Sequence, residues 1–329
     1  MYLHPVSQKI LADYQVRKSR KQKLDFEHWL IRSLANEGVE MWTEEHSGLF
    51  KSRNLIVGDP DNCDYILSAH YDTAPVLPFP NFIAPRNLLI TILYQLVVVM
   101  VPLSLLIAGL SFLLSHFFSE IHPLTFFLSN LFLLFLVLGL MLFGPANKHT
   151  ANDNTSGVIS VIETILAVSS VKRERICFVL FDLEEAGLLG SAAFRKKHNS
   201  SMKTTPLINL DCVSDGDHLL VILNRKASQL PEFKQRLMDS FQAHVQEMPD
   251  KILRFEKAER IFYPSDQMGF PLSAAIAVFK KKPLIGYYID RLHTRHDVIF
   301  NEHNIQIISS ALASFFGCDN LPENKGTDV

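Results

Sequence analysis

Residues 65–73 read YILSAHYDT, an apolar run followed directly by His70, Tyr71 and Asp72. The run from Tyr65 to Ala69 is typical of a short buried β-strand. Its end carries a histidine and a carboxylate, and in open α/β sheets binding sites form beyond the carboxyl ends of the strands. This stretch therefore predicts an α/β fold whose chemistry begins at His70 and Asp72.

Five further acids and histidines stand at the ends of predicted strands or helices downstream: Asp153, Glu184, Glu185, Asp211 and His293. Three separate strand ends would then deliver an acid or a histidine to the same edge of a sheet. A purely structural domain has no need of that pattern. We therefore interpret these side chains, with His70 and Asp72, as one functional site.

Helical and strand-like patterns alternate along the chain outside one long apolar segment. Apolar residues recur with helical spacing in residues 7–35, 155–169, 187–198, 231–246 and 301–316. Short apolar runs typical of strands occupy residues 39–43, 54–57, 65–69, 175–182, 207–212, 219–223, 274–279 and 284–288. This alternation predicts an α/β fold with a mainly parallel, mixed sheet and helices on both faces.

Two long apolar segments, residues 87–118 and 123–143, separate Asp72 from Asp153. Each reaches the roughly 20 residues that a helix needs to cross a bilayer core, and Pro102 inside the first is tolerated in a membrane helix. The alternative is a buried pair of soluble helices, but such helices are rarely apolar all round at this length. We therefore predict a transmembrane helical hairpin whose short link, residues 115–122, contains no Lys or Arg.

Both ends of a hairpin return to the same side of the membrane, and basic residues flank these two ends. Arg86 precedes the hairpin and Lys148 follows it, so the positive-inside rule places that side in the cytoplasm. Residues 1–15 contain no continuous apolar core of a signal peptide. The four cysteines show no CxxC spacing, which fits a reducing compartment. We expect an integral membrane protein with a cytoplasmic catalytic domain.

The simplest organisation is one α/β domain interrupted by the hairpin. Residues 1–86 form the N-terminal part of the catalytic domain, residues 87–145 the hairpin inserted in an active-site loop, and residues 146–329 the C-terminal part. The chain has 32 basic and 34 acidic residues, so its charge gives no reason to expect a nucleic-acid partner. The expected partners are short peptide substrates and the lipid bilayer.

The side chains of the predicted site suit a particular kind of metal chemistry. Two histidines and several carboxylates favour zinc, or cobalt or manganese. A carboxylate that bridges two ions lets them sit roughly 3.5–4 Å apart, and a bound water then ionises at a pKa lowered towards about 7. A further carboxylate is needed to take the proton from that water. The adjacent Glu184 and Glu185 can supply one ligand and one base.

These residues lie in motifs that resemble the co-catalytic zinc aminopeptidase family, which includes bacterial leucyl aminopeptidases and the glutamate carboxypeptidase II group. The motifs follow the family's order from about Tyr65 to the end, outside the hairpin. They are His70-Tyr71-Asp72-Thr73, Asn152-Asp153-Asn154-Thr155-Ser156-Gly157, residues 184–191 (EEAGLLGS), Asn209-Leu210-Asp211, Ser265-Asp266 and His293-Thr294-Arg295-His296-Asp297. Each motif alone is weak, whereas their common order is strong evidence.

The resemblance implies a role for each matching residue. His70 and Asp211 would complete one zinc site, Glu185 and His293 the other, and Asp153 would bridge the two ions. Glu184 would be the general base, and Asp72 would orient His70, as metal-bound histidines usually require. The resemblance also implies a cis peptide between Asp153 and Asn154. The implied function is a membrane-anchored aminopeptidase with two zinc ions.

Two features depart from the family's pattern. Ser265-Asp266-Gln267 stands where relatives often have Ser-Asp-His, and the hairpin replaces a short loop. Because the hairpin starts beside the metal residues, we expect the site to open close to the bilayer. Two other functions stay open: a glutaminyl-peptide cyclase with one zinc, and a non-enzymatic membrane receptor or assembly subunit. The remaining candidates have ordinary expected roles, with His149, His198 and His296 at the surface and Tyr263 in packing.

Overall fold

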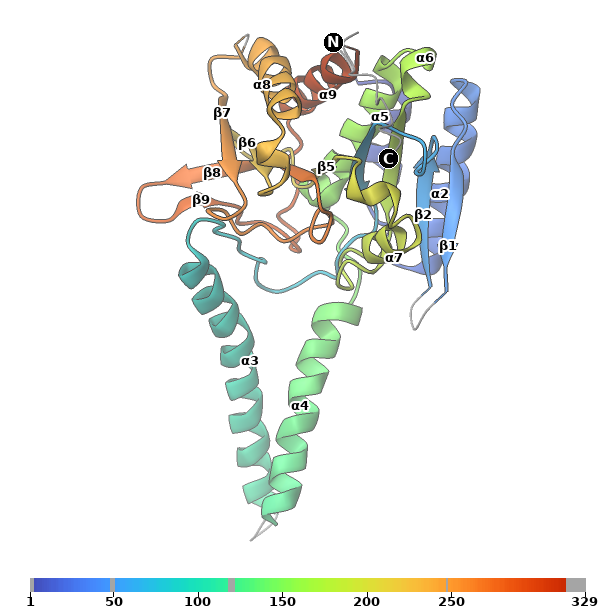
Figure 1. Cartoon of the computed structure of the whole chain (residues 1–329). Helices are drawn as coiled ribbons and strands as arrows, with labels where there is room; N and C mark the ends of the chain where they lie inside the picture. The colour runs from blue at the N-terminus through green and yellow to red at the C-terminus, as the bar shows by residue number, and fades with distance from the viewer. Residues whose placement is uncertain (1–2, 48–50, 118–121, 247, 318–329) are drawn as a thin grey trace.

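The computed structural model describes residues 3–47, 51–117, 122–246 and 248–317. These residues form an α/β domain from one side of which two long helices extend (Figure 1). The predicted hairpin link lies partly outside the described residues, and so does Cys318. The described cysteines Cys63, Cys177 and Cys212 are free thiols.

A mixed sheet of nine strands organises the described part of the domain. Its order is β1 (Trp42–His46), β2 (Ser52–Val57), β4 (Ile176–Phe181), β3 (Tyr65–His70), β5 (Leu207–Leu210), β8 (Ser273–Lys282), β6 (His218–Leu223) and β7 (Ile252–Lys257), with β9 (Gly286–Tyr288) paired to β8. The central strands β4, β3, β5 and β8 run parallel, as do β6 and β7. Antiparallel pairs join β1 to β2, β2 to β4, β6 to β8 and β8 to β9. The predicted mixed α/β sheet is confirmed, and its parallel strands form a continuous block at the centre of the sheet.

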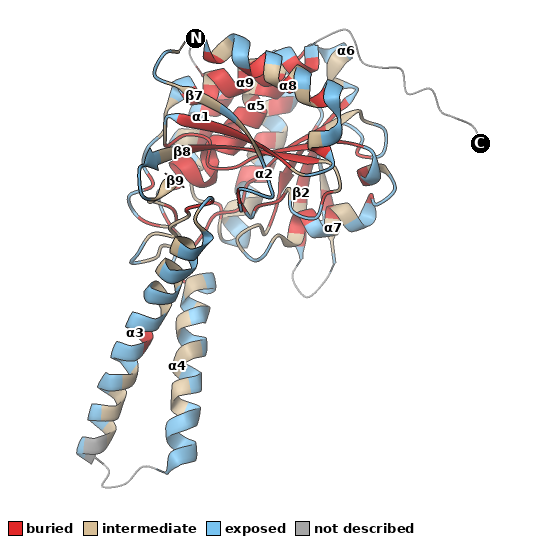
Figure 2. Cartoon of the chain, turned by 60° about the vertical axis from the view of Figure 1, so that its left-hand side comes forward, coloured by how far each residue is buried: buried red, intermediate tan, exposed pale blue. Residues whose placement is uncertain are grey.

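Helices cover both faces of this sheet, as predicted. Alternate residues of the strands face opposite sides, so Phe178 and Leu180 join one hydrophobic cluster while Cys177 and Val179 join another. The first face is covered by α1 (Pro5–Asp13), α2 (Arg20–Asn36), α5 (Gly157–Ala167), α8 (Pro231–Val245) and α9 (Glu302–Gly317). The second face is covered by α7 (Leu189–Lys197) through Phe194. Figure 2 shows the buried sheet between these layers.

Short helical segments connect the larger elements. They are the π-helical turn η1 (Ala151–Ser156), α6 (Ser170–Arg173), and the 3-10 turns η2 (Ser201–Lys203) and η3 (Ala227–Gln229). The first of these is interrupted, because Asp153 and Asn154 have non-helical backbone angles. The chain therefore changes direction at Asp153, immediately before α5.

The two apolar segments form α3 (Leu88–Phe117) and α4 (Pro123–Phe143), which project together from the domain (Figures 1 and 2). Leu88–Leu114 and Pro123–Phe143 are each long and apolar enough to cross a membrane. Only 6% and 0% of their most apolar stretches are buried. A pair of core helices would be mostly buried, so the described structure contradicts burial of these helices within this domain.

The structure corrects two of the predicted elements and adds a strand that the sequence did not predict. The predicted helix 7–35 is two helices, α1 and α2, and the strand predicted at 39–43 lies at Trp42–His46 instead. Strand β7, Ile252–Lys257, was not predicted. It lies at the edge of the sheet and is only half-buried, so its sequence, ILRFEK, carries too weak an apolar signal.

The break between α1 and α2 places the side chain of Arg17 inside the protein, fully buried. Its Nε donates to the carbonyl oxygen of Tyr71 at 2.5 Å, and its guanidinium also donates to Thr155 Oγ1 at 3.2 Å. Burial lowers the pKa of Arg17 to about 10, although the carboxylates of Asp72 and Asp153 oppose that shift. Arg17 therefore ties the segment that follows β3 to the start of α5.

Replacing Arg17 by methionine is expected to lower the free energy of unfolding by about 2–4 kcal/mol, because it leaves the buried carbonyl of Tyr71 and hydroxyl of Thr155 without their donor. Urea unfolding of the detergent-solubilised protein measures this change. Arg20→Met is the matched control, since Arg20 is exposed on α2, and its effect should stay within about 0.5 kcal/mol. Equal effects of the two substitutions would contradict the role of Arg17.

Candidate metal centre

Three adjacent parallel strands bring acids and a histidine to one edge of the sheet. His70 is the last residue of β3, Asp211 directly follows β5, and Glu184 and Glu185 follow β4. Strand β3 lies between β4 and β5 and is parallel to both. The carboxyl ends of these strands therefore meet, and the side chains converge as the sequence predicted.

Asp153 lies between two histidines and presents one carboxylate oxygen to each. Its Oδ1 is 3.3 Å from Nε2 of His70, and its Oδ2 is 3.1 Å from Nε2 of His293. Asp211 Oδ1 is 3.7 Å from the same nitrogen of His70, and Glu185 Oε2 is 3.1 Å from that of His293. Each histidine is thus paired with its own carboxylate, and both share Asp153.

The donor atoms form groups compact enough to hold a metal ion. Atoms of His70, Asp153 and Asp211 lie within 4.8 Å of one another, and so do atoms of Asp153, Glu185 and His293. A further group of this kind combines His70 with Glu184 and Glu185. Within the described part of the chain, Glu185 Oε1 and Asp211 Oδ1 are buried without a hydrogen-bond partner. Buried carboxylate oxygens need a partner, so these nitrogen and oxygen donors fit a divalent metal such as zinc.

The two acids beside the histidines differ in their tendency to hold a proton. Burial raises the pKa of Glu184 well above its ordinary value, and the charges of Glu185 and Asp211 add to this effect. Burial also opposes the ionisation of Asp153, but hydrogen bonds from His293 and His70 hold its pKa below the ordinary value. Glu184 is therefore suited to accept a proton, whereas Asp153 stays ionised as a ligand should.

Asp72 supports the site in two ways, of which the sequence predicted one. Its backbone carbonyl lies 3.1 Å from Nδ1 of His70, closer than its carboxylate at 3.6 Å. The carboxylate instead accepts hydrogen bonds from the backbone N–H groups of Glu184 at 3.0 Å and Glu185 at 3.2 Å. Asp72 thus orients His70 mainly through its main chain, and its side chain positions the two glutamates.

The segment around Asp153 is fixed by Asn154. The peptide bond between them is cis, as the family resemblance implies. The side chain of Asn154 donates to the carbonyl of Leu210 at 2.9 Å and accepts from the N–H of Gly157 at 3.0 Å. A Cβ atom at Gly157 would lie 2.3 Å from Asn154 Oδ1, so a larger residue would force the Asn154 side chain out of this position. These contacts fasten the shared carboxylate to the end of β5, next to Asp211.

The comparisons with known proteins agree with this geometry. The profile described as peptidase family M28 matches residues 139–314, more than half of the 329 residues. The chain belongs to peptidase family M28. The predicted relation to zinc aminopeptidases is thereby confirmed, and it supports a peptidase-type hydrolase that uses zinc. The matched M28 segment begins after His70 and Asp72, which are placed at the site by the fold alone.

Solved structures share the M28 fold at low identity, whereas no curated protein sequence matches the chain. Glutaminyl cyclase from Bacteroides thetaiotaomicron is 15% identical with a TM-score of 0.57, covering 96% of this chain and 97% of its own. A Zn-dependent exopeptidase from Parabacteroides distasonis is 14% identical with a TM-score of 0.56, covering 94% of both chains. The LapA aminopeptidase of Legionella pneumophila is 13% identical with a TM-score of 0.53, covering 94% and 67%. Identities this low establish a common fold and no more.

Asp297 supports the M28 centre in a way that the sequence did not predict. Its carboxylate accepts the backbone N–H groups of Asn152 at 2.9 Å and Asp153 at 3.0 Å. Burial and the charge of Asp153 raise the pKa of Asp297 to about 8, and the two N–H donors oppose that shift. The sequence could have indicated this role of Asp297 through its position, because it ends the motif that begins with His293, four residues earlier.

Strained backbone is concentrated around these residues. The non-glycine residues with positive φ in the described chain are Leu183 (57°), Leu188 (62°), Cys212 (55°) and His293 (61°). Each is a site residue, is adjacent to one or lies in the motif of the two glutamates. Such conformations cost free energy and persist where the surroundings impose them. The residues around the M28 centre are therefore held in backbone conformations that non-glycine residues seldom adopt without such surroundings.

The other candidates lie near the centre or away from it. His149 and His296 are exposed as expected. His198 is buried instead, with hydrogen bonds to Glu44 at 2.9 Å and Asp61 at 2.8 Å, so its surface assignment is wrong. Tyr263 packs edge-on against Phe279 and donates to the carbonyl of Asp211 at 3.2 Å, in keeping with a packing role.

The Ser265-Asp266-Gln267 motif lies beside the centre rather than in it. Gln267, which departs from the family's histidine, accepts from Asn209 at 3.1 Å and donates to the carbonyl of Tyr263 at 2.6 Å. Asp266 is fully buried, and that burial raises its pKa to about 7. Gln267 therefore has a structural role within this loop.

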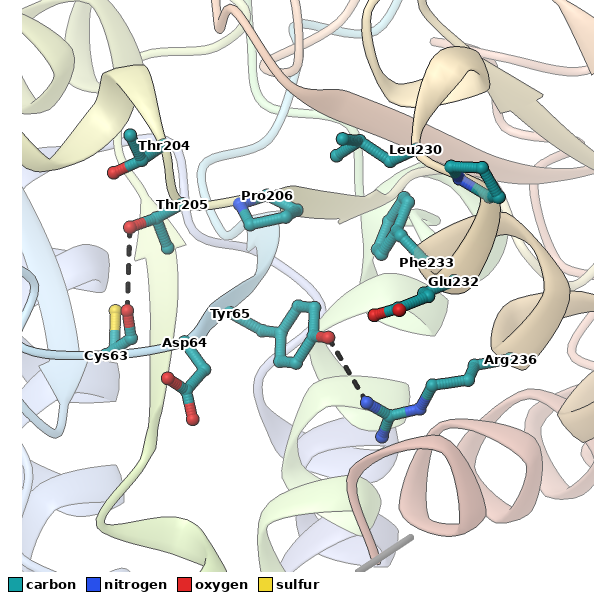
Figure 3. Close-up of a pocket in the computed structure, with 11 residues that line it drawn as sticks. Cys63, Asp64, Tyr65, Thr204, Thr205, Pro206, Leu230, Glu232, Phe233 and Arg236 are labelled. Atoms are coloured by element: carbon teal, nitrogen blue, oxygen red, sulfur yellow. Dashed lines mark hydrogen bonds between the residues drawn. The ribbon is translucent and has the colours of Figure 1, made fainter. Parts of the chain in front are cut away.

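A cavity of about 470 Å³ lies at the opposite end of the sheet (Figure 3). Tyr65, the first residue of β3, and Pro206, just before β5, line it together with Arg236, whose guanidinium donates to the hydroxyl of Tyr65 at 3.3 Å. At about 3.3 Å per residue, the start of β3 is roughly 16 Å from His70. This cavity is therefore separate from the M28 centre.

Replacing Asp297 by asparagine is expected to weaken zinc binding by about 10–100-fold, as loss of a group that positions a ligand usually does. An asparagine side chain offers one acceptor oxygen and a donor that opposes the second backbone N–H. Titration with a competing chelator measures the affinity. His296→Gln, at the exposed neighbouring position, is the control, and unchanged affinity in Asp297→Asn would refute the assigned role.

Proposed function

We propose that this M28 protein is an aminopeptidase with two zinc ions that removes the N-terminal residue from short peptides. The proposal rests on the position of Asp153, whose two carboxylate oxygens face two separate histidine–carboxylate pairs. His70 with Asp211 would hold one ion, and His293 with Glu185 the other. A carboxylate placed to bridge two ions is typical of hydrolytic two-metal sites.

Glu184 is the proposed general base. Two bound zinc ions would polarise the scissile carbonyl and activate a water near neutral pH. Glu184 accepts the proton of the attacking water and passes it to the leaving amine, a role for which burial, by raising its pKa, prepares it. The hydrogen bond from its backbone N–H to Asp72 fixes its position.

We also propose that α3 and α4 anchor the enzyme in a membrane. Their length, apolar character and lack of burial support this, and both return to the same side of the catalytic domain (Figure 1). Arg86 and Lys148, which flank the hairpin, favour a cytoplasmic position for that domain. The substrates would then be short cytoplasmic peptides, and the site would open close to the bilayer surface.

Glu184→Gln is expected to reduce turnover of a leucyl amide by about 10²–10⁴-fold, the usual contribution of a general base, and to leave the zinc content unchanged. Glu185→Gln is the matched comparison, because it should lose zinc as well as activity. Amide hydrolysis and elemental analysis of the same preparations give both readings. Full activity in Glu184→Gln would contradict the mechanism.

Glutaminyl-peptide cyclisation is the second candidate, supported by the fold that this chain shares with the glutaminyl cyclase from Bacteroides thetaiotaomicron. The non-enzymatic alternative has less support, because every ligand position is filled and the side chains converge. Cyclisation on one zinc would leave one of the two histidine–carboxylate pairs without a metal.

Zinc content separates hydrolysis from cyclisation. We expect two zinc ions per chain, loss of leucyl amide hydrolysis when a chelator removes them, and recovery when zinc is restored. Elemental analysis and hydrolysis assays on the detergent-solubilised chain measure this. One zinc per chain, with pyroglutamate formed from a glutaminyl peptide, would favour the cyclase instead.

A further inference from the structure

A second cavity lies directly beside the metal centre and is partly built by the hairpin. Its volume is about 230 Å³, and Asp72 and Glu185 line it on the side of the centre. Leu142 and Phe143, the last residues of α4, line it as well. Pockets that bind drug-sized ligands measure roughly 300–1,000 Å³, so this smaller space suits one residue of a peptide held at the centre.

The walls of this cavity are mostly apolar. Pro75, Leu183 and Ala186 face it together with the two residues from α4. Leu142 and Phe143 remain 50% and 71% exposed, so a ligand can still cover them. An apolar side chain in the cavity would gain contact with these surfaces, since burial of apolar area is favourable.

The charged residues Lys23, Asp72 and Glu185 line the cavity, and each has at least one hydrogen-bond or ion-pair partner in the protein. The carboxylate of Asp72 accepts two backbone N–H groups, and Glu185 lies against His293. Lys23 forms an ion pair with Asp182 at 2.6 Å. Among the described residues, none of the carboxylates lies within ion-pair distance of Lys18.

Lys18 comes from the segment between α1 and α2. Its Nζ donates to the carbonyl of Leu142 at 3.0 Å. An ammonium group has three N–H donors, and that carbonyl takes one of them in the described structure. The charges of Glu185 and Asp72 act on Lys18 from a distance, and a carboxylate in the cavity would add the direct ion pair that no described carboxylate of the protein forms with it.

We propose that this cavity binds the C-terminal residue of a dipeptide, with an apolar side chain against Phe143 and Leu183 and the terminal carboxylate on Lys18. The inference rests on the proposed aminopeptidase function and specifies its substrate class. The metal centre holds the N-terminal residue, and the next residue is then the one that carries the free carboxylate. An apolar side chain alone would explain the walls of the cavity but not Lys18.

Leucyl-leucine and leucyl-leucinamide differ only in the terminal charge and therefore test the proposal. The zinc-loaded full chain in detergent should hydrolyse the free acid with a kcat/KM about 10–100-fold above that of the amide, the value of a charged hydrogen bond. Lys18→Met should bring this ratio close to one, and Lys18→Arg should retain most of it. Lys21→Met, at an exposed position of α2, is the control and should keep the full ratio.

Binding to the Glu184→Gln variant gives a second measurement that needs no turnover. Calorimetry should show tighter binding of leucyl-leucine than of its amide, and Lys18→Met in the same background should remove the difference. If the variant binds the acid more tightly than the amide but the parent enzyme hydrolyses neither, the proposed role of the cavity is supported and the hydrolytic function is refuted. If acid and amide are turned over with equal kcat/KM and bind equally, the function is supported and this inference is overturned. If neither compound binds, this inference is overturned as well.

Discussion

The structure depends on sharing one buried carboxylate, that of Asp153, between two histidines. Asp153 lies close to Asp211 and to Glu185, so like charges repel there. Asp153 and Asp211 are buried, and buried charges are tolerated when cations or hydrogen bonds compensate them. The protein groups supply part of that compensation through His70 and His293. Buried oxygens on Glu185 and Asp211 remain without a hydrogen-bond partner in the described chain. A metal is the natural partner for them, so the surroundings serve to hold these ligands in place.

The hairpin is connected to this centre through its ends. The segment that leads to α3 pairs with the segment that leaves α4, since Val76 N–H donates to the carbonyl of Pro145 at 2.8 Å and Asn147 N–H to that of Ala74 at 3.2 Å. The next amide, that of Leu77, donates to the carbonyl of His293 at 2.7 Å. A displacement of the hairpin relative to the domain would therefore act on the backbone of His293, a proposed metal ligand. The proposed membrane anchor and the centre therefore meet at these paired segments.

The sequence predicted the residues whose signal is local. His70, Asp211 and the two glutamates were found because each follows an apolar strand, and parallel strands bring such ends together. Arg17 and Asp297 were not found, because their partners are backbone groups distant in the chain. Arg17 lies 54 residues from Tyr71 and Asp297 lies 144 residues from Asp153. The helical pattern over residues 7–35 concealed the break at Arg17 for the same reason, since the contacts that stabilise the break are tertiary.

The position of Lys18 links these observations. It follows Arg17, which fastens the same segment to the carbonyl of Tyr71, and it reaches the last turn of α4. Cations are stabilised near the carbonyl groups at a helix C-terminus. Lys18 belongs to the catalytic domain, and its contact with the end of α4 therefore joins that domain to the proposed membrane helix. If α4 crosses a bilayer, its final residues lie at the membrane surface, and the cavity beside Glu185 lies there as well. A substrate with both an apolar side chain and a carboxylate is suited to that boundary, because the apolar part can contact Phe143 while the charge remains on the polar side.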